Sequence, residues 1–284
     1  MTAKTLLTFD IHKCDDPEDI RHATEWLLQQ QLPAIYFVPT DLLENEDFLV
    51  EIRHAMATGI EIGTHGHNHD EKEIFSLMRG DPQELDFLKK SKETYENLLG
   101  RSPTIFRSPH WCPLASNSYK TLVELGYRID MSPTPQRIPL FSSLPFSSTW
   151  FFSPRSVHTN EHGLLVVPSS TFIFPLGMPT FSILGGLLSV LFLYALKLEA
   201  SISKRKILNI MLHVGDLHPN AKPKPNPPKS FDMLLPKKYG GFGFKHLLRK
   251  DCPVALHKIT VAIFKNLRTT NFCSSSHIHS ISKS

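Results

Sequence analysis

Short apolar runs alternate with longer stretches of helical spacing through the first two-thirds of the chain. Residues 6–9, 34–38 and 60–62 are the first three apolar runs, and each predicts a buried strand. Residues 17–28 and 45–58 have the 3.6-residue apolar spacing of amphipathic helices. This alternation predicts an α/β fold in which crossover helices join parallel strands.

Local signals define the later elements. Asp16-Pro17 and Asp81-Pro82 each supply an N-cap and a first-turn proline, while Gly59, Gly100 and Gly126 end helices. The remaining expected strands are 104–106, 127–129, 164–167 and 207–212, and the remaining expected helices are 116–125 and 183–200.

Polar residues follow strand after strand at the carboxyl end, which is where α/β barrels build their active sites. Residues 131–156 are rich in Pro, Ser and Phe and predict an irregular or short-stranded excursion over the barrel mouth. We therefore expect a single main domain over residues 1–220. Residues 221–284 are expected to form a Pro- and Lys-rich extension, beginning AKPKPNPPKS, and a partly ordered tail.

The composition narrows the class of protein. The chain has 284 residues, 41% of them hydrophobic, which is enough to bury a core and argues against disorder of the whole. A formal charge of +4, with the two signs interspersed, gives no indication of nucleic acid as a partner. The four cysteines are scattered without a C-x-x-C pair, which fits reduced thiols better than disulfides or a thiolate zinc site.

The start of the chain and one apolar segment bear on location. The N-terminus enters a strand pattern directly, without the features of an export signal, so a cytoplasmic location is expected. Residues 172–198 are apolar, but Pro175, Pro179 and the pair Gly185-Gly186 interrupt them. About 14 apolar residues are left, fewer than the ~20 that a membrane span requires. We expect a buried helix and no transmembrane span.

His65 and His69 lie in the turn after an apolar strand. A spacing of four puts both imidazoles on one side of a helical turn, where they suit a single zinc-like ion, while His67 between them should point away. Asp10 ends the first strand, and His12 faces the same way if the strand continues, while Phe9 and Ile11 turn inward. A carboxylate beside a three-ligand metal can act as the general base for its water.

Three more polar residues close strands. Arg107 can pair with Asp10 and hold it ionised, and Asp130 can orient the imidazole of His213. Taken singly, each residue also has a structural explanation, as a capping histidine, a turn aspartate or an ordinary ion pair. Five strand ends with complementary chemistry together favour a metal-dependent hydrolase over a binding module.

Five ordered motifs resemble those of the polysaccharide deacetylases, the group with NodB homology. They are TFD at 8–10, EIGTHGHNH at 61–69, FRSP at 106–109, GYRIDMS at 126–132 and IMLHVGDLHP at 210–219. The segment VVPSSTFIFPLGMPTFSILGG ahead of the last histidine is most similar to the branch with a Gly-rich segment there.

The resemblance implies a distorted (β/α) barrel with one divalent metal ion, zinc being the expected one, that hydrolyses an N-acyl group on an amino sugar. It implies Asp10 as the base, with Arg107 as its partner. His213 would be the acid, partnered by Asp130. The backbone near residues 109–111 would hold the oxyanion.

It implies His65 and His69 as metal ligands. Where many members have a carboxylate, this chain has Ile11 and His12. Either His12 is the third ligand, giving an all-histidine site, or that ligand is lost. The third motif reads SPHW where glycine commonly follows the proline, so the loop at His110 is expected to differ in shape.

The expected function is therefore removal of an N-acyl group, N-acetyl first, from an amino sugar or glycan conjugate. Two alternatives stay open: a non-catalytic glycan-binding barrel with a degraded metal site, and a hydrolase of a linear or cyclic non-sugar amide. Metal content separates the first alternative from an enzyme, and a substrate panel separates the second.

Overall fold

A computed structural model describes residues 3–136, 152–172, 174–203 and 206–218, with 258, 260, 261, 263, 264, 272–276 and 278. Its centre is a curled eight-stranded sheet in the order β10-β1-β2-β3-β4-β5-β7-β6. Neighbouring strands are parallel, except that β6 and β7 pair antiparallel. The strands are β1 (Lys4–Asp10), β2 (Ala34–Val38), β3 (Glu61–Thr64), β4 (Ile105–Phe106), β5 (Ile129–Asp130), β6 (His158–Thr159), β7 (Leu165–Val166) and β10 (Ile207–His213). A separate two-stranded sheet holds β8 (Thr171–Phe172) and β9 (Phe174–Pro175).

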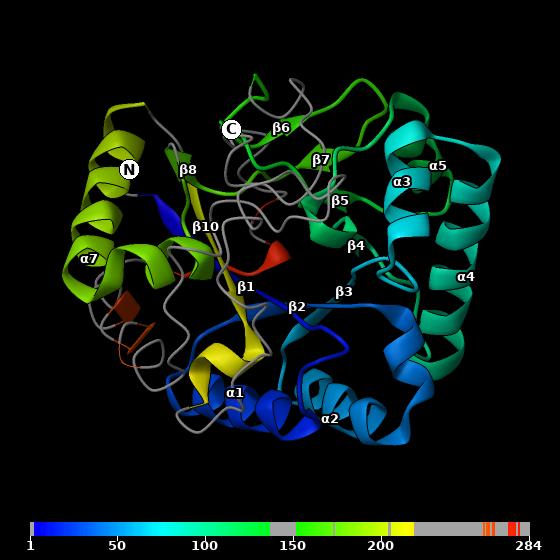
Figure 1. The fold of residues 1–284 in the computed structure, drawn as a ribbon, viewed down its shortest axis with the longest axis horizontal. Coiled ribbons are helices and arrows are strands. Elements are labelled where there is room, and N and C mark those ends of the chain that lie inside the picture. The colour runs from blue at the N-terminus through cyan, green and yellow to red at the C-terminus, as the bar shows by residue number, and fades with distance from the viewer. Residues whose placement is uncertain are drawn as a thin grey trace, which may run out of the picture.

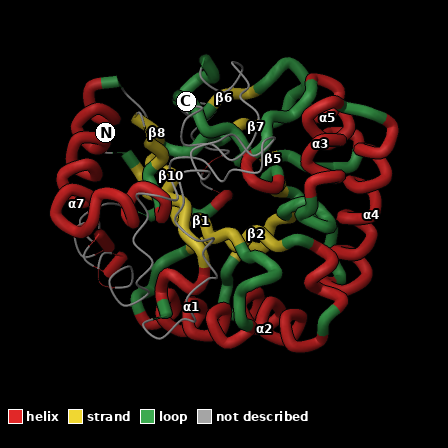
Figure 2. Tube along the Cα trace, viewed as in Figure 1, coloured by secondary structure: helices red, strands yellow, loops and turns green. Residues whose placement is uncertain are grey.

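Helices surround the curled sheet on its outer side, as Figure 1 shows, and Figure 2 shows the strands gathered at the centre. They are α1 (Pro17–Gln29), α2 (Glu46–Ala57), α3 (Glu71–Arg79), α4 (Pro82–Leu99), α5 (Ser116–Glu124) and α7 (Met178–Ile202). The expected α/β class and distorted (β/α) barrel are confirmed.

Alternation along β1 places side chains on the two faces of the sheet. Leu7 and Phe9 are buried in the cluster shared with the helices, and Ile11 continues that side beyond the strand. Leu6 belongs to a second cluster inside the curl. Phe9 and Ile11 are buried as expected, but they face the helix layer rather than the barrel interior.

Capping residues explain most helix limits. Asp16 accepts a hydrogen bond from the backbone N–H of Glu18, and Pro17 begins α1, as the sequence predicted. Gly100 ends α4 at φ 69°, a left-handed conformation that glycine adopts without strain. Helix α3 was not among the predicted elements. It is short and its apolar spacing is brief, but Asp70 caps it through the N–H of Glu73.

Helix α7 differs from the expectation. It spans 25 residues with a kink at Gly185 (φ 73°), and Leu184–Ile202 is long and apolar enough to cross a membrane by length and composition. The expectation of a buried helix is wrong, because only 22% of that segment is buried and Leu187 is 75% exposed.

Parts of the expected excursion and extension can be placed. Residues 137–151 and most of 221–284 lie outside the described residues. Of the described C-terminal residues, Phe272 bridges to Thr5, and Cys273 donates its backbone N–H to the carbonyl of Thr5. Ile278 is buried inside the curl, so this part of the tail packs on the barrel.

Candidate functional site

The carboxyl ends of four parallel strands meet at one rim of the sheet. The register pairs Asp10 of β1 with His213 of β10. Thr64 pairs with Phe106, so His65 and Arg107 follow neighbouring strand ends. Strand pairing alone thus brings together Asp10 and His213, which lie 203 positions apart in the sequence.

Asp10 is held by two donors. Arg107 is fully buried and donates from one terminal nitrogen to Oδ1 of Asp10 at 2.6 Å and from the other to the Thr8 hydroxyl at 2.9 Å. The indole Nε1 of Trp111 donates to Oδ2 of Asp10 at 2.8 Å. Burial raises the pKa of Asp10, but the Arg107 charge, followed by those of His65 and His213, outweighs it and lowers the pKa. Asp10 is therefore ionised at neutral pH.

The pairing of Arg107 with Asp10 is as expected, whereas the role of Trp111 was missed. Nothing in the sequence signals the Trp111 contact beyond its place just after the FRSP motif.

Three imidazoles converge beside Asp10. One ring nitrogen from each of His12, His65 and His69 lies within 4.8 Å of the others, a grouping suited to one metal ion. Nε2 of His65 lies 3.9 Å from Oδ2 of Asp10, and the ring of His213 lies 4.9 Å from that of His12, centre to centre. The expected ligand set and the expected base and acid thus border one site.

The nitrogens of His65 and His69 fit a metal. Nδ1 of His65 lies 3.0 Å from the carbonyl of Arg107, and because a carbonyl only accepts, Nδ1 carries the hydrogen and Nε2 keeps its lone pair for a ligand. Nε2 of His69 is buried and has no hydrogen-bond partner among the described residues. Burial, followed by the charges of His65 and His110, lowers the pKa of His69 to about 2, so its ring is neutral as metal binding requires.

The loop carrying His65 and His69 is not the helical turn that the spacing suggested. Gly66 has φ 77° and His69 has φ 55°, so the chain folds back through left-handed conformations. His67 points away as expected, with Nδ1 2.9 Å from the hydroxyl of Thr40.

Glu73 of α3 holds this loop. Its fully buried carboxylate accepts from the backbone N–H groups of His67 at 2.7 Å, Asn68 at 2.9 Å and His69 at 2.8 Å. Burial raises the pKa of Glu73 to about 7, against the lowering effect of these three bonds. The only sequence signal for Glu73 is a glutamate four positions after the last histidine of the motif, at the start of a helix.

The carboxylate beside His213 is not the expected one. Oδ2 of Asp216 lies 3.5 Å from Nδ1 of His213 and accepts its backbone N–H at 2.7 Å, in a capping box. Asp130 instead accepts from the backbone N–H of Ser132 at 2.9 Å and from its hydroxyl, and burial raises the pKa of Asp130 to about 6. The short loop after β10 explains the difference, because it returns a carboxylate three positions after the histidine.

Part of the backbone that was expected to hold the oxyanion already forms hydrogen bonds within its own loop. The N–H of Trp111 donates to the carbonyl of Ser108, and that of Cys112 donates to Pro109, both inside the 3₁₀ turn Pro109–Trp111. His110 has φ 52°, so this loop has an unusual shape, as the SPHW sequence suggested.

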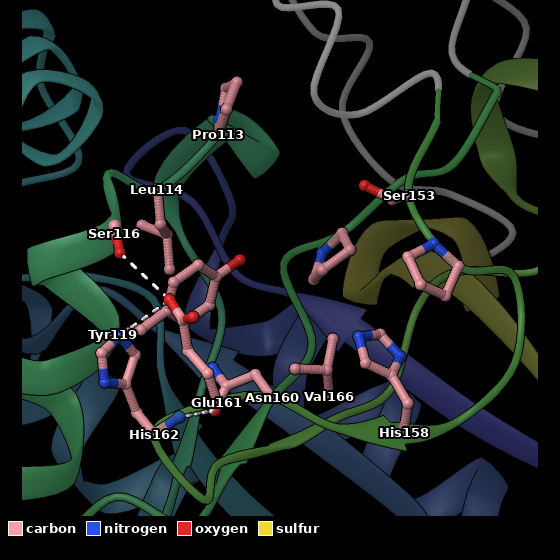
Figure 3. Close-up of a pocket in the computed structure, with 12 residues that line it drawn as sticks. Pro113, Leu114, Ser116, Tyr119, Ser153, His158, Asn160, Glu161, His162 and Val166 are labelled. Atoms are coloured by element: carbon pink, nitrogen blue, oxygen red, sulfur yellow. Dashed lines mark hydrogen bonds and ion pairs between the residues drawn. The ribbon is translucent and has the colours of Figure 1, made fainter.

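A pocket of about 350 Å³ lies further along the same rim, beyond β4, β5 and β7. Figure 3 shows Leu114 and Tyr119 on one side of it and His158 on the other. Oδ1 of Asn160 accepts two backbone N–H groups, and its amide nitrogen has no partner within the part of the chain that the structure describes, so it is left as a donor.

Comparison with known proteins finds a family model that matches the first half of the barrel. Residues 2–129 match the family model described as polysaccharide deacetylase. A curated relative, the peptidoglycan deacetylase of Helicobacter pylori, is 30% identical over 101 residues, which are 36% of this chain and 32% of the relative. The chain thus matches about a third of the length of that relative.

Solved structures share the fold. A protein from Mycobacterium smegmatis described as a polysaccharide deacetylase superposes with a TM-score of 0.59 at 16% identity, covering 99% of this chain and 90% of that one. A pseudoenzyme of the CE4 family from Bacillus anthracis gives a TM-score of 0.50 at 9% identity, covering 98% and 65%. At these identities the similarity extends to the fold alone.

Proposed function

We propose, because residues 2–129 match the polysaccharide deacetylase family model, that this chain is a metal-dependent hydrolase of N-acyl amino sugars. The substrate is an amino sugar or a glycan conjugate, and the acyl group that we put first is acetyl. Zinc is the proposed ion, since neutral imidazoles favour it over the hard cations that prefer oxygen ligands.

One observation carries the proposal: an ionised, doubly held Asp10 borders three convergent imidazoles. Either Arg107 or Trp111 alone would orient the carboxylate, and together they fix both of its oxygens. An ion pair with a purely structural role would not require a histidine cluster beside it, and a histidine cluster without a catalytic role would not require an oriented carboxylate. Their occurrence together therefore favours catalysis.

The residues divide the chemistry between them. A bound divalent ion would polarise the acyl carbonyl and lower the pKa of the attacking water. Asp10 accepts the proton of that water, since its lowered pKa keeps it ionised. His213, whose ring lies 4.9 Å from that of His12, donates a proton to the departing amine, and Asp216, with Oδ2 3.5 Å from Nδ1 of His213, orients its ring.

The Asp10→Asn variant tests this assignment. It keeps the shape of the side chain and removes the base, so release of acetate from N-acetylglucosamine oligomers should fall at least a hundredfold while the zinc content stays at one ion per chain. Retained turnover would refute the role of Asp10. A panel that adds small linear and cyclic amides decides between a sugar amide and a non-sugar amide as substrate.

A second candidate function is glycan binding without turnover. It is favoured by His12 at the position where family members carry a carboxylate, and one protein of similar fold is described as a pseudoenzyme. Under this alternative the purified protein holds no metal and gains no activity with zinc, cobalt or manganese.

A further inference from the structure

The pocket between helix α5 and the hairpin of β6 and β7 has no part in the chemistry assigned to Asp10 and His213. Its volume of about 350 Å³ is at the lower end of the range of about 300–1,000 Å³ for small-molecule sites. None of the three convergent histidines lines it. A ligand in this pocket would therefore be held beside the proposed metal site and not in it.

Two walls of the pocket continue from the segments that hold the proposed base. Leu114 lines the pocket and comes three residues after Trp111, whose indole donates to Asp10. Pro133 lines it as well and comes two residues after Met131, whose carbonyl accepts Nε–H of Arg107 at 3.2 Å. The pocket therefore adjoins the rim that carries the proposed catalytic residues.

The side of the pocket formed by α5 is apolar with one hydroxyl. Leu114 and the ring of Tyr119 form this side, and Figure 3 shows the hydroxyl of Tyr119 directed toward the middle of the pocket. That hydroxyl makes no hydrogen bond to any other residue that the structure describes. An apolar ligand would leave it unpaired, whereas a ligand with its own hydroxyl groups would satisfy it.

The opposite side, formed by the hairpin, is fixed in advance. Oδ1 of Asn160 accepts the backbone N–H of His162 at 3.0 Å and that of Leu164 at 2.9 Å, which closes the turn. Nδ1 of His158 lies 3.0 Å from the carbonyl of Ser156, so Nδ1 carries a hydrogen and Nε2 is the acceptor of the neutral ring. Because this side is already ordered, binding a ligand requires little further ordering.

The charge of the lining excludes a strongly anionic ligand. The residues that line the pocket include one carboxylate, Glu161, and no lysine or arginine. A phosphate or carboxylate group would therefore lose its hydration without gaining a permanent positive charge. Apolar walls with a few hydrogen-bonding groups suit a neutral sugar ring, whose C–H faces pack on Leu114 and Tyr119 while its hydroxyl groups bind the polar side chains.

We propose that this pocket binds a neutral sugar unit of a glycan chain, while another unit of the same chain carries its acyl group to the metal site. The hydroxyl of Tyr119 and Nε2 of His158 hydrogen-bond the hydroxyl groups of this sugar unit from opposite sides. The inference rests on the proposed function, since it makes the substrate an oligosaccharide and not a single amino sugar. Sugar binding itself requires no turnover, so the two can be tested separately.

Calorimetry on the zinc-free full chain tests the proposal with the tetramer and the monomer of N-acetylglucosamine. The tetramer should bind at least tenfold more tightly than the monomer. Tyr119→Phe keeps the ring and removes one hydrogen bond, so it should weaken tetramer binding about fivefold. His158→Ala should weaken tetramer binding at least as much. Neither variant should change the affinity for the monomer.

Tyr194→Phe on α7 and His54→Ala on α2 are the matched controls, since neither residue lines the pocket. Both should bind the tetramer as the unchanged protein does, and circular dichroism should show all variants folded. Equal affinity for tetramer and monomer overturns the proposal, and so do Tyr119→Phe and His158→Ala variants that bind like the controls.

A second readout separates this inference from the proposed activity. With zinc restored, acetate release at the same kcat/KM for tetramer and monomer would support the hydrolase and overturn the role of the pocket. Tetramer binding that Tyr119→Phe weakens, without acetate release from any oligomer, would support the pocket and refute the hydrolase.

Discussion

Removing the Glu73 carboxylate should loosen the loop that carries two of the three metal ligands. In Glu73→Ala, the N–H groups of His67, Asn68 and His69 lose their acceptor together. At about 1 kcal/mol for each bond, the free energy of unfolding should fall by about 3 kcal/mol. That is a large part of the 5–15 kcal/mol that stabilises a typical domain.

The same change should weaken metal binding. The left-handed conformation of His69 costs about 1–3 kcal/mol and persists because the loop is held in place. If the metal must restore that conformation, the lost stabilisation appears as a higher Kd for the metal. A cost of about 3 kcal/mol corresponds to roughly a hundredfold. Glu73→Gln keeps one acceptor oxygen. Its free energy of unfolding and its Kd for the metal should therefore lie between those of Glu73→Ala and those of the unchanged protein.

Two measurements check this pair of effects: urea unfolding with a chelator present, and zinc affinity by competition with a chromophoric chelator. Glu51→Ala is the control, since Glu51 is also a buried glutamate but lies on α2 and pairs with Arg21 at 2.7 Å. The reasoning is refuted if Glu73→Ala keeps its zinc affinity, or if Glu51→Ala loses as much.

Three further predictions follow from the same geometry. Gly66→Ala should lose about 3 kcal/mol of stability against about 1 kcal/mol for Gly100→Ala: both glycines have positive φ, but the new carbon would meet a heavy atom at 2.6 Å only at Gly66. Equal losses in urea unfolding would contradict this. Burial raises the pKa of Asp130 from 3.8 to about 6, so the folded state holds that proton more tightly and its stabilising effect is lost as pH rises from about 4 to about 6. Relative to the unchanged protein, Asp130→Asn should therefore gain about 3 kcal/mol between pH 4 and pH 7, and a constant difference would show that Asp130 is not protonated in the fold. Trp111→Phe removes one donor to Asp10 and should lower kcat/KM about tenfold with the zinc content retained, whereas unchanged kinetics would make the indole contact irrelevant.

The sequence predicted the elements whose signals are local. Asp16-Pro17 and Gly100 determine helix ends through single residues, and the apolar runs of β1 and β2 determine strands. The convergence of Asp10, Arg107 and the histidines was also predictable, because parallel strands bring their carboxyl ends to one rim whatever the loops between them do.

The features that were missed depend on tertiary contacts. Glu73 acts through a loop that turns back on it, and Trp111 reaches Asp10 from a 3₁₀ turn with left-handed φ values. Asp216 lies beside His213 where Asp130 was expected, because the short turn after β10 brings a carboxylate back to the histidine within three residues. Helix α7 was taken as buried on all sides, since composition cannot tell which side of an apolar helix the fold covers.

The number of zinc ions retained per chain after exhaustive dialysis tests the central claim, a single ion held by His12, His65 and His69 beside Asp10. The account predicts one ion in the unchanged protein and none in the variant with all three histidines changed to alanine, while His54→Ala, on α2, keeps the ion. A protein that retains no zinc, or a triple variant that retains as much as the unchanged chain, would contradict it.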